Sequence, residues 1–88
     1  MTTIEQGFLQ ERDNTGIEEA LASMFAKVFD LESASIDDNF FQLGGDSLKG
    51  SLLTNAIEEA FGVVVSLSIL LEAPTPRRLA VAIFEKSA

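Results

Sequence analysis

Three consecutive valines, at residues 63–65, form the only strand-like run in this sequence, and the other apolar residues recur at helical spacing. A single strand cannot build a sheet, because its backbone N–H and C=O groups need a second strand as partner. We therefore predict an all-α fold, in which the valines form a connector that fills part of the core. With 88 residues, of which 47% are apolar, the chain is long enough for one small domain.

The first helix is predicted over residues 16–30. Thr15 and Glu18 have the spacing of a capping box, and apolar side chains follow at helical intervals. The predicted inward residues are Ile17, Leu21, Met24 and Val28, with Ala20, Phe25 and Leu31 widening the stripe. Residues 1–14 are polar enough to be a loose lead, so we place the domain at residues 15–86.

The second helix is predicted from Ser47 to Gly62, since glycine suits the left-handed position beyond a helix end. Its predicted inward residues are Leu53, Ile57, Ala60 and Phe61, with Leu48 near its start. The long connection before it, residues 31–46, carries the apolar residues Ile36, Phe40, Phe41 and Leu43, which we expect to anchor it to the bundle.

Two helices are predicted after the valines. A short one covers residues 69–72, capped by Ser66 or Ser68 and stopped before Pro74. The last begins with Thr75 as cap and Pro76 at the first helical position. Its inward residues are Leu79, Ala80, Ile83 and Phe84. Arg77 and Arg78 lie unfavourably at the positive end of this helix, which indicates a contact that the sequence does not identify.

The charge balance excludes several partner classes. A formal net charge of −8 repels nucleic acid and anionic membrane surfaces, and it favours encounters with basic patches on proteins. The N-terminus lacks the basic-then-apolar order of a signal peptide, so we expect a cytoplasmic protein. The acids of the long connection lack the spacing of a calcium loop, so no metal site is predicted; they are Asp30, Glu32, Asp37 and Asp38.

Ser47 is the candidate functional residue. Gly44 and Gly45 allow a tight turn, and a helix start then presents the hydroxyl beside free N–H groups that favour a phosphodiester. The string Gly-Asp-Ser-Leu also occurs in esterases, but this chain has no histidine to serve as base. A phosphate-binding loop needs lysine where Asp46 stands. An ordinary helix cap, formed by Ser47 or Asp46, remains the alternative.

The run FFQLGGDSL resembles the attachment site of phosphopantetheine-bearing carrier proteins, especially the peptidyl carriers of nonribosomal synthesis. The similarity extends from about Thr15 to Phe84, through DDNFFQLGG, AFGVVVSL and LLEAPTPRRLA. It implies a four-helix bundle of the acyl carrier type. It also implies that Ser47 receives 4′-phosphopantetheine from coenzyme A through a magnesium-dependent transferase, with Gly45, Asp46 and Leu48 beside it. The thiol of this arm would carry acyl or aminoacyl thioesters.

The implied partners are a phosphopantetheinyl transferase, the enzymes that load acyl or aminoacyl groups, and downstream synthase enzymes. We expect a monomer that is not itself an enzyme, with a partner-binding face formed by Lys49, Ser51, Leu52, Glu58 and Glu59. Gly50, Ser51 and Leu52 depart from the family pattern, so the matching transferase stays open. The alternative function is a noncovalent acidic helical adaptor. The length suggests a free-standing carrier, although an excised domain would look the same.

Overall fold

Four helices make up the described part of the chain. The computed structural model describes residues 15–87, and the predicted lead, residues 1–14, lies outside them. The helices are α1 (Thr15–Val28), α2 (Ser47–Phe61), α3 (Leu67–Glu72) and α4 (Pro76–Ser87). Residues 15–87 contain no strand, which confirms the predicted all-α fold.

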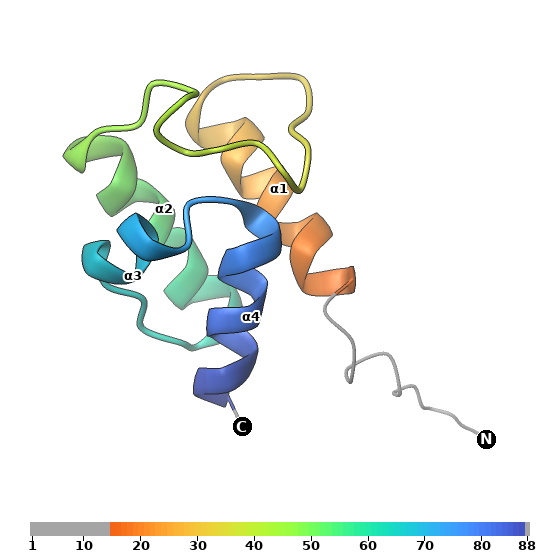
Figure 1. Cartoon of the computed structure of the whole chain (residues 1–88), viewed down its shortest axis with the longest axis vertical. Coiled ribbons are helices and arrows are strands. Elements are labelled where there is room, and N and C mark those ends of the chain that lie inside the picture. Colours follow the sequence, from red (N-terminus) through yellow and green to blue (C-terminus); the bar gives the residue numbers. More distant parts are fainter. Residues whose placement is uncertain (1–14, 88) are drawn as a thin grey trace.

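The helices surround one apolar core (Figure 1). Helix α1 packs against α2 and α4, and the short α3 contacts both α2 and α4. The long connection between α1 and α2 runs across one end of the bundle. The fully buried large side chains come from all four helices and from this connection, and they include Leu21, Phe25, Phe40, Leu53, Ile57, Leu70, Leu79 and Ile83.

Helix α1 ends two residues before the predicted boundary. Asp30 adopts a left-handed conformation, with φ of 58°, and turns the chain out of the helix. The N–H of Leu31 then donates to the carbonyl of Ala26 at 2.8 Å. Leu31 therefore lies beyond the helix and is exposed, so its placement in the inward stripe was wrong. The predicted capping box depends on the side chain of Thr15, which the structure does not describe, so the capping box stays a prediction.

Helix α2 ends where the sequence predicts. Gly62 has φ of 69°, and its N–H donates to the carbonyl of Glu58 at 2.8 Å. Leu53 and Ile57 are buried as predicted, but Ala60 and Leu48 are exposed and were wrongly assigned to the inward stripe. The third residue of the buried face is Gly50 instead, because α3 covers that part of α2.

Helix α3 begins two residues earlier than predicted. Ser66 is its cap: the hydroxyl accepts from the N–H of Ile69 at 3.2 Å, which resolves the choice between the two serines. In the connector before it, Val65 is buried, whereas Val64 is largely exposed, so only part of the valine run fills the core.

Helix α4 begins as predicted with the Thr75 hydroxyl, which accepts from the N–H of Arg78 at 3.2 Å. Leu79, Ala80 and Ile83 are buried. Phe84 is more than a third exposed although its neighbour Ile83 is buried, so its inward placement was wrong.

The long connection is attached to the start of α4 and to the residues just before it by four hydrogen bonds. The Arg77 guanidinium donates twice to the Asp37 carboxylate, at 2.8 and 2.9 Å. The N–H of Arg77 donates to the carbonyl of Ile36, and the N–H of Phe40 donates to the carbonyl of Pro74 at 2.7 Å. The unfavourable position of Arg77 at the start of α4 indicated an unidentified contact. That contact is the ion pair with Asp37, which lies forty residues earlier in the chain.

We predict that the Asp37 carboxyl titrates below its ordinary pKa of 3.8, because the hydrogen bonds and charge of Arg77 favour the carboxylate. Since the folded-state pKa is lowered, the pair stabilises the fold above pH 3.8, and this stabilisation is lost as the pH falls through the folded-state value. NMR titration of the Asp37 carboxyl carbon measures the midpoint. In Arg77→Gln the midpoint should rise toward the ordinary value, and an unchanged midpoint would contradict the prediction.

Candidate functional site

Phe40 anchors the segment that leads to Ser47. Its ring is fully buried and contacts two rings edge to face, that of Phe25 on α1 and that of Phe29 just after α1, with centroid distances of 6.0 and 5.2 Å. The neighbouring Phe41 contacts the Phe40 ring at 5.1 Å but remains exposed over about 40% of its surface. Of the predicted anchors, Phe40 is fully buried and Leu43 packs against the core, whereas Phe41 lies at the surface.

A tight turn follows this anchor. The Asn39 side chain accepts from the N–H groups of Phe41 and Gln42 at 2.8 and 3.2 Å, and the N–H of Gly45 donates to the carbonyl of Phe40 at 3.0 Å. Gly44 has φ of 102°, a conformation that favours glycine. The chain is thus folded back on Phe40 immediately before α2 begins.

Gly45 is required for a different reason: the backbone passes so close to the Phe40 ring here that no side chain fits. A Cβ atom at this position would overlap the Phe40 ring and lie 2.7 Å from the Phe40 carbonyl oxygen. The ring cannot move away, since it is enclosed in the core. Gly45 therefore fixes the distance between the aromatic anchor and the first residues of α2.

Asp46 caps α2 and leaves Ser47 exposed. The Asp46 carboxylate accepts from the N–H of Lys49 at 2.9 Å, and the Asp46 carbonyl accepts from the N–H of Gly50 at 2.8 Å. Ser47 is the first residue of α2 and lies on the surface. Because Asp46 supplies the cap, the Ser47 hydroxyl is not needed for that purpose.

An apolar groove begins at Ser47. It has a volume of about 340 Å³ and lies between the long connection and α3. Asp46 and Ser47 line one end, and the other lining residues are Phe40, Phe41, Leu67, Leu70 and Leu71. Sequence reasoning missed Leu67 and Leu71, although their spacing of four residues places both on one face of a helix.

The residues of the predicted partner-binding face lie along α2. Ser51, Leu52, Glu58 and Glu59 are exposed, and Lys49 is half-buried. Leu48 is the most exposed large apolar residue of α2, at 68%. The glutamates lie about 16 Å from Ser47 along the helix axis, given the rise per residue. The structure thus brings Leu48, Ser51 and Leu52 near Ser47, and it places both glutamates toward the other end of α2.

Gly50, an oddity in the sequence, has a structural role. A Cβ atom at this buried position would lie 2.7 Å from Cδ2 of Leu67 and 3.5 Å from Cδ2 of Leu70. Its absence lets α3 approach α2 closely beside the groove. This role could not be predicted from local sequence patterns, since the contact joins two different helices.

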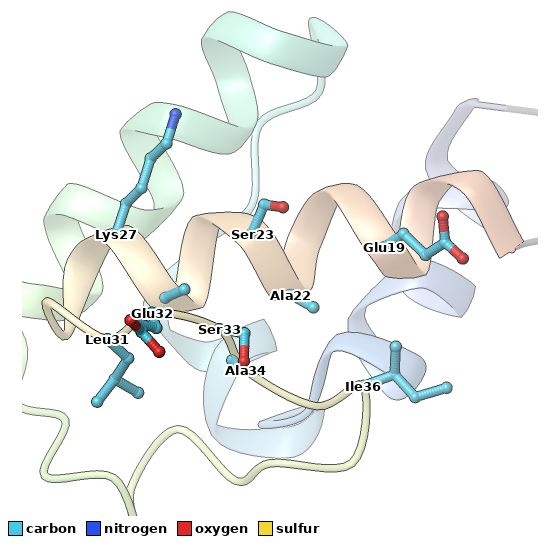
Figure 2. Close-up of a pocket in the computed structure, with 10 residues that line it drawn as sticks. Glu19, Ala22, Ser23, Lys27, Leu31, Glu32, Ser33, Ala34 and Ile36 are labelled. Atoms are coloured by element: carbon cyan, nitrogen blue, oxygen red, sulfur yellow. The ribbon is translucent and has the colours of Figure 1, made fainter.

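A second hollow, of about 370 Å³, lies between α1 and the start of the long connection (Figure 2). Glu19, Ser23 and Lys27 line it from α1, and Glu32 and Ile36 line it from the connection. No residue of the predicted site lines this hollow.

Within residues 15–87, no cluster of three or more histidine, cysteine, aspartate or glutamate residues could hold a metal ion. None of the four helices has the length and apolar content needed to cross a bilayer.

The geometry defines a class of protein, namely a helical bundle that presents an exposed serine directly after a Gly-Gly-Asp turn. The family model for the phosphopantetheine attachment site matches residues 19–83. The chain therefore belongs to this family of carrier proteins, whose members carry covalent 4′-phosphopantetheine and whose carrier domains are non-catalytic.

The relatives and solved structures agree with this assignment. The chain is 46% identical over 66 residues to surfactin synthase subunit 2 of Bacillus subtilis; the match covers 75% of this chain and 2% of that subunit. BlmI, a type-II acyl carrier protein from Streptomyces verticillus involved in bleomycin biosynthesis, has the same fold, with a TM-score of 0.82 at 23% identity over 90% of this chain and 95% of BlmI.

A further solved structure contains a peptidyl carrier protein bound to the phosphopantetheine transferase Sfp in complex with coenzyme A. Its match has a TM-score of 0.72 at 31% identity, over 76% of this chain and 87% of the matched chain. The predicted four-helix carrier fold and the predicted covalent cofactor are thereby confirmed.

We predict that Gly45→Ala destabilises the fold by about 1–3 kcal/mol, the usual cost of overpacking a closed core. Gly45 precedes the Asp46 cap and lies outside α2, so helix propensity does not enter and the expected loss comes from the contact with Phe40. Urea unfolding measures the change. The matched control is Gly16→Ala in the exposed first turn of α1, where a Cβ meets nothing within 4 Å and the change should stay below about 1 kcal/mol. Equal effects in both variants would contradict the prediction.

Proposed function

We propose that Ser47 is the attachment residue of this carrier and that a phosphopantetheinyl transferase modifies it with coenzyme A as donor. The observation that carries the proposal is the position of Ser47: it is exposed, it begins α2, and the turn before it is fixed to the core through Phe40. The Ser47 oxygen would form the new phosphodiester bond, and the nucleotide part of coenzyme A would leave.

The start of α2 suits the modified serine electrostatically. N–H groups and the positive end of the helix dipole favour the negative charge of a phosphodiester at this point. Asp46 already accepts one hydrogen bond, from Lys49 at 2.9 Å, and its carboxylate is exposed. Asp46 therefore can cap α2 and also contact a transferase and its magnesium ion, as the family resemblance implies.

The proposed role of the loaded protein is delivery of thioesters between enzymes. A tethered intermediate reaches successive active sites at a high effective concentration, without being released. The similarity to surfactin synthase subunit 2 supports cargo of the nonribosomal peptide type, and loading and downstream synthase enzymes as partners. Leu48, Ser51 and Leu52 lie near the attachment point and form the proposed contact face with Lys49, and Glu58 and Glu59 lie toward the other end of α2. The cytoplasmic location and the monomeric state stay predictions.

We expect incubation with coenzyme A, magnesium and a broad-specificity transferase to add one phosphopantetheine to the protein. Intact-mass spectrometry measures the gain. Ser47→Ala should show no gain, because the acceptor oxygen is absent. Ser23→Ala, which removes an exposed hydroxyl on α1, should be modified like the wild type. If several transferases leave the folded wild type unmodified, the noncovalent adaptor becomes the better explanation.

Asp46→Asn separates the two roles of this side chain. Asparagine caps helices about as well as aspartate, so the free energy of unfolding should change by less than about 0.5 kcal/mol. The kcat/KM of modification should fall about tenfold, the cost of one lost charge-assisted contact. Unfolding curves and initial rates of mass gain give the two values. Asp46→Ala is the comparison, since it should also lose about 1 kcal/mol of stability. An unchanged rate in Asp46→Asn would show that the residue only caps.

A further inference from the structure

Arg78 carries a charge that the described structure leaves without a partner. It lies exposed in the first turn of α4, at the positive end of the helix dipole, where a cation is unfavourable. Its neighbour Arg77 is paired with Asp37, but among the residues that the structure describes the Arg78 guanidinium forms no ion pair. The position of Arg78 therefore favours a negatively charged contact from the rest of the chain.

Two apolar side chains continue along the same side of α4. Val81 and Phe84 follow Arg78 at intervals of three residues, so the three side chains are neighbours along the helix. Val81 is 44% exposed and Phe84 is 37% exposed, although Leu79 and Ile83 on the same helix are buried. The α4 strip, which we define as Arg78, Val81 and Phe84, thus joins a cation to exposed apolar surface.

The lead, residues 1–14, has the matching chemistry. It contains one basic residue and three acidic ones, which are Glu5, Glu11 and Asp13. It also contains an adjacent apolar pair, Phe8 and Leu9. The hollow of Figure 2 is a poorer match for this acidic segment, since two carboxylates line it, those of Glu19 and Glu32.

The lead joins the bundle within reach of the α4 strip. Helix α1 packs against α4, and the charge of Glu18 in the first turn of α1 contributes to the raised pKa of Arg77 in the first turn of α4. Leu9 stands six residues before Thr15, and an extended chain of this length spans about 20 Å. Helix α4 has 12 residues and is therefore about 18 Å long.

We propose that the lead binds across the α4 strip. Its apolar pair covers Val81 and Phe84, and its carboxylates nearest to α1, those of Glu11 and Asp13, lie around Arg78. Because the lead is tethered to α1, it binds at a high effective concentration and needs little buried area. A second copy of the chain would need about 800 Å² of buried surface on each partner, far more than two partly exposed side chains provide.

Paramagnetic labelling of the full chain tests this arrangement. The chain has no cysteine, so Gln6→Cys places a single nitroxide in the lead. The nitroxide broadens the amide resonances of residues close to it. The amides of Val81 and Phe84 should be broadened more than that of Gly16, at the start of α1, and more than that of Leu31, which lines the hollow of Figure 2. A mixture of labelled protein with unlabelled, isotope-enriched protein reports contacts between two chains.

Matched variants of the labelled protein connect the broadening to the α4 strip. Val81→Gln should lower the relaxation enhancement of the Phe84 amide about threefold to tenfold, as expected for one lost aliphatic contact. Leu31→Gln should leave it unchanged. The two substituted side chains are 44% and 42% exposed in the wild type, so neither change alters the buried core.

A second pair of variants tests the charge. Arg78→Glu should weaken the enhancement at Phe84, because the carboxylates of the lead are then repelled. Lys27→Glu makes the same change of charge at an exposed position on α1 and should not weaken it. The dispersion of the amide spectrum shows that each variant is folded.

Broadening centred on Gly16 or on Leu31 in the wild type would overturn the proposal. Equal effects of Val81→Gln and Leu31→Gln would overturn it as well. Broadening of α4 that is as strong in the mixed sample as in the labelled chain would show that a second copy, and not the lead, covers the strip.

Discussion

The burial of the Phe40 ring is the constraint on which the rest of the site depends. The Phe40 ring joins the long connection to Phe25 on α1 and to Phe29 just after that helix, and the Phe40 N–H donates to the carbonyl of Pro74 before α4. The Phe40 carbonyl accepts a hydrogen bond from the N–H of Gly45. Only glycine fits at that position, because a Cβ atom there would overlap the Phe40 ring. The start of α2 is therefore positioned by core packing, although Asp46 and Ser47 themselves are exposed.

This arrangement explains how a surface serine is held firmly enough for recognition by another protein. Asp46 satisfies the cap of α2, so Ser47 can be exposed without loss of helix stability. In the proposed function the chemistry at the end of the arm belongs to other enzymes, and this chain supplies a positioned serine and an acidic surface.

Sequence reasoning predicted what local patterns determine. Glycine and proline marked the ends of helices, and the apolar spacing identified Leu53, Ile57 and Leu79 as core residues. Tertiary packing decided the rest. Both Asp46 and Ser47 are good caps, so only the structure could assign that role. Leu48 is as apolar as the leucines of the core, so its residue type alone favours burial, but it lies exposed on the surface of α2.

For the same reason, long-range contacts could not be predicted from the sequence. The partner of Arg77 is Asp37, and Gly50 is explained only by the approach of Leu67 from another helix. The groove at Ser47 arises from three segments that no local pattern relates. The residues 1–14 that precede the family match lie outside the described part of the chain.

The central claim is that the core-anchored turn presents Ser47, and no other hydroxyl, for modification. Peptide mapping by mass spectrometry after co-expression with a transferase tests it most directly. A single phosphopantetheine on the fragment that contains Ser47, localised to that residue by fragmentation, is the predicted result. Modification of Ser51, one turn further along α2, or of a serine elsewhere in the folded protein would contradict it.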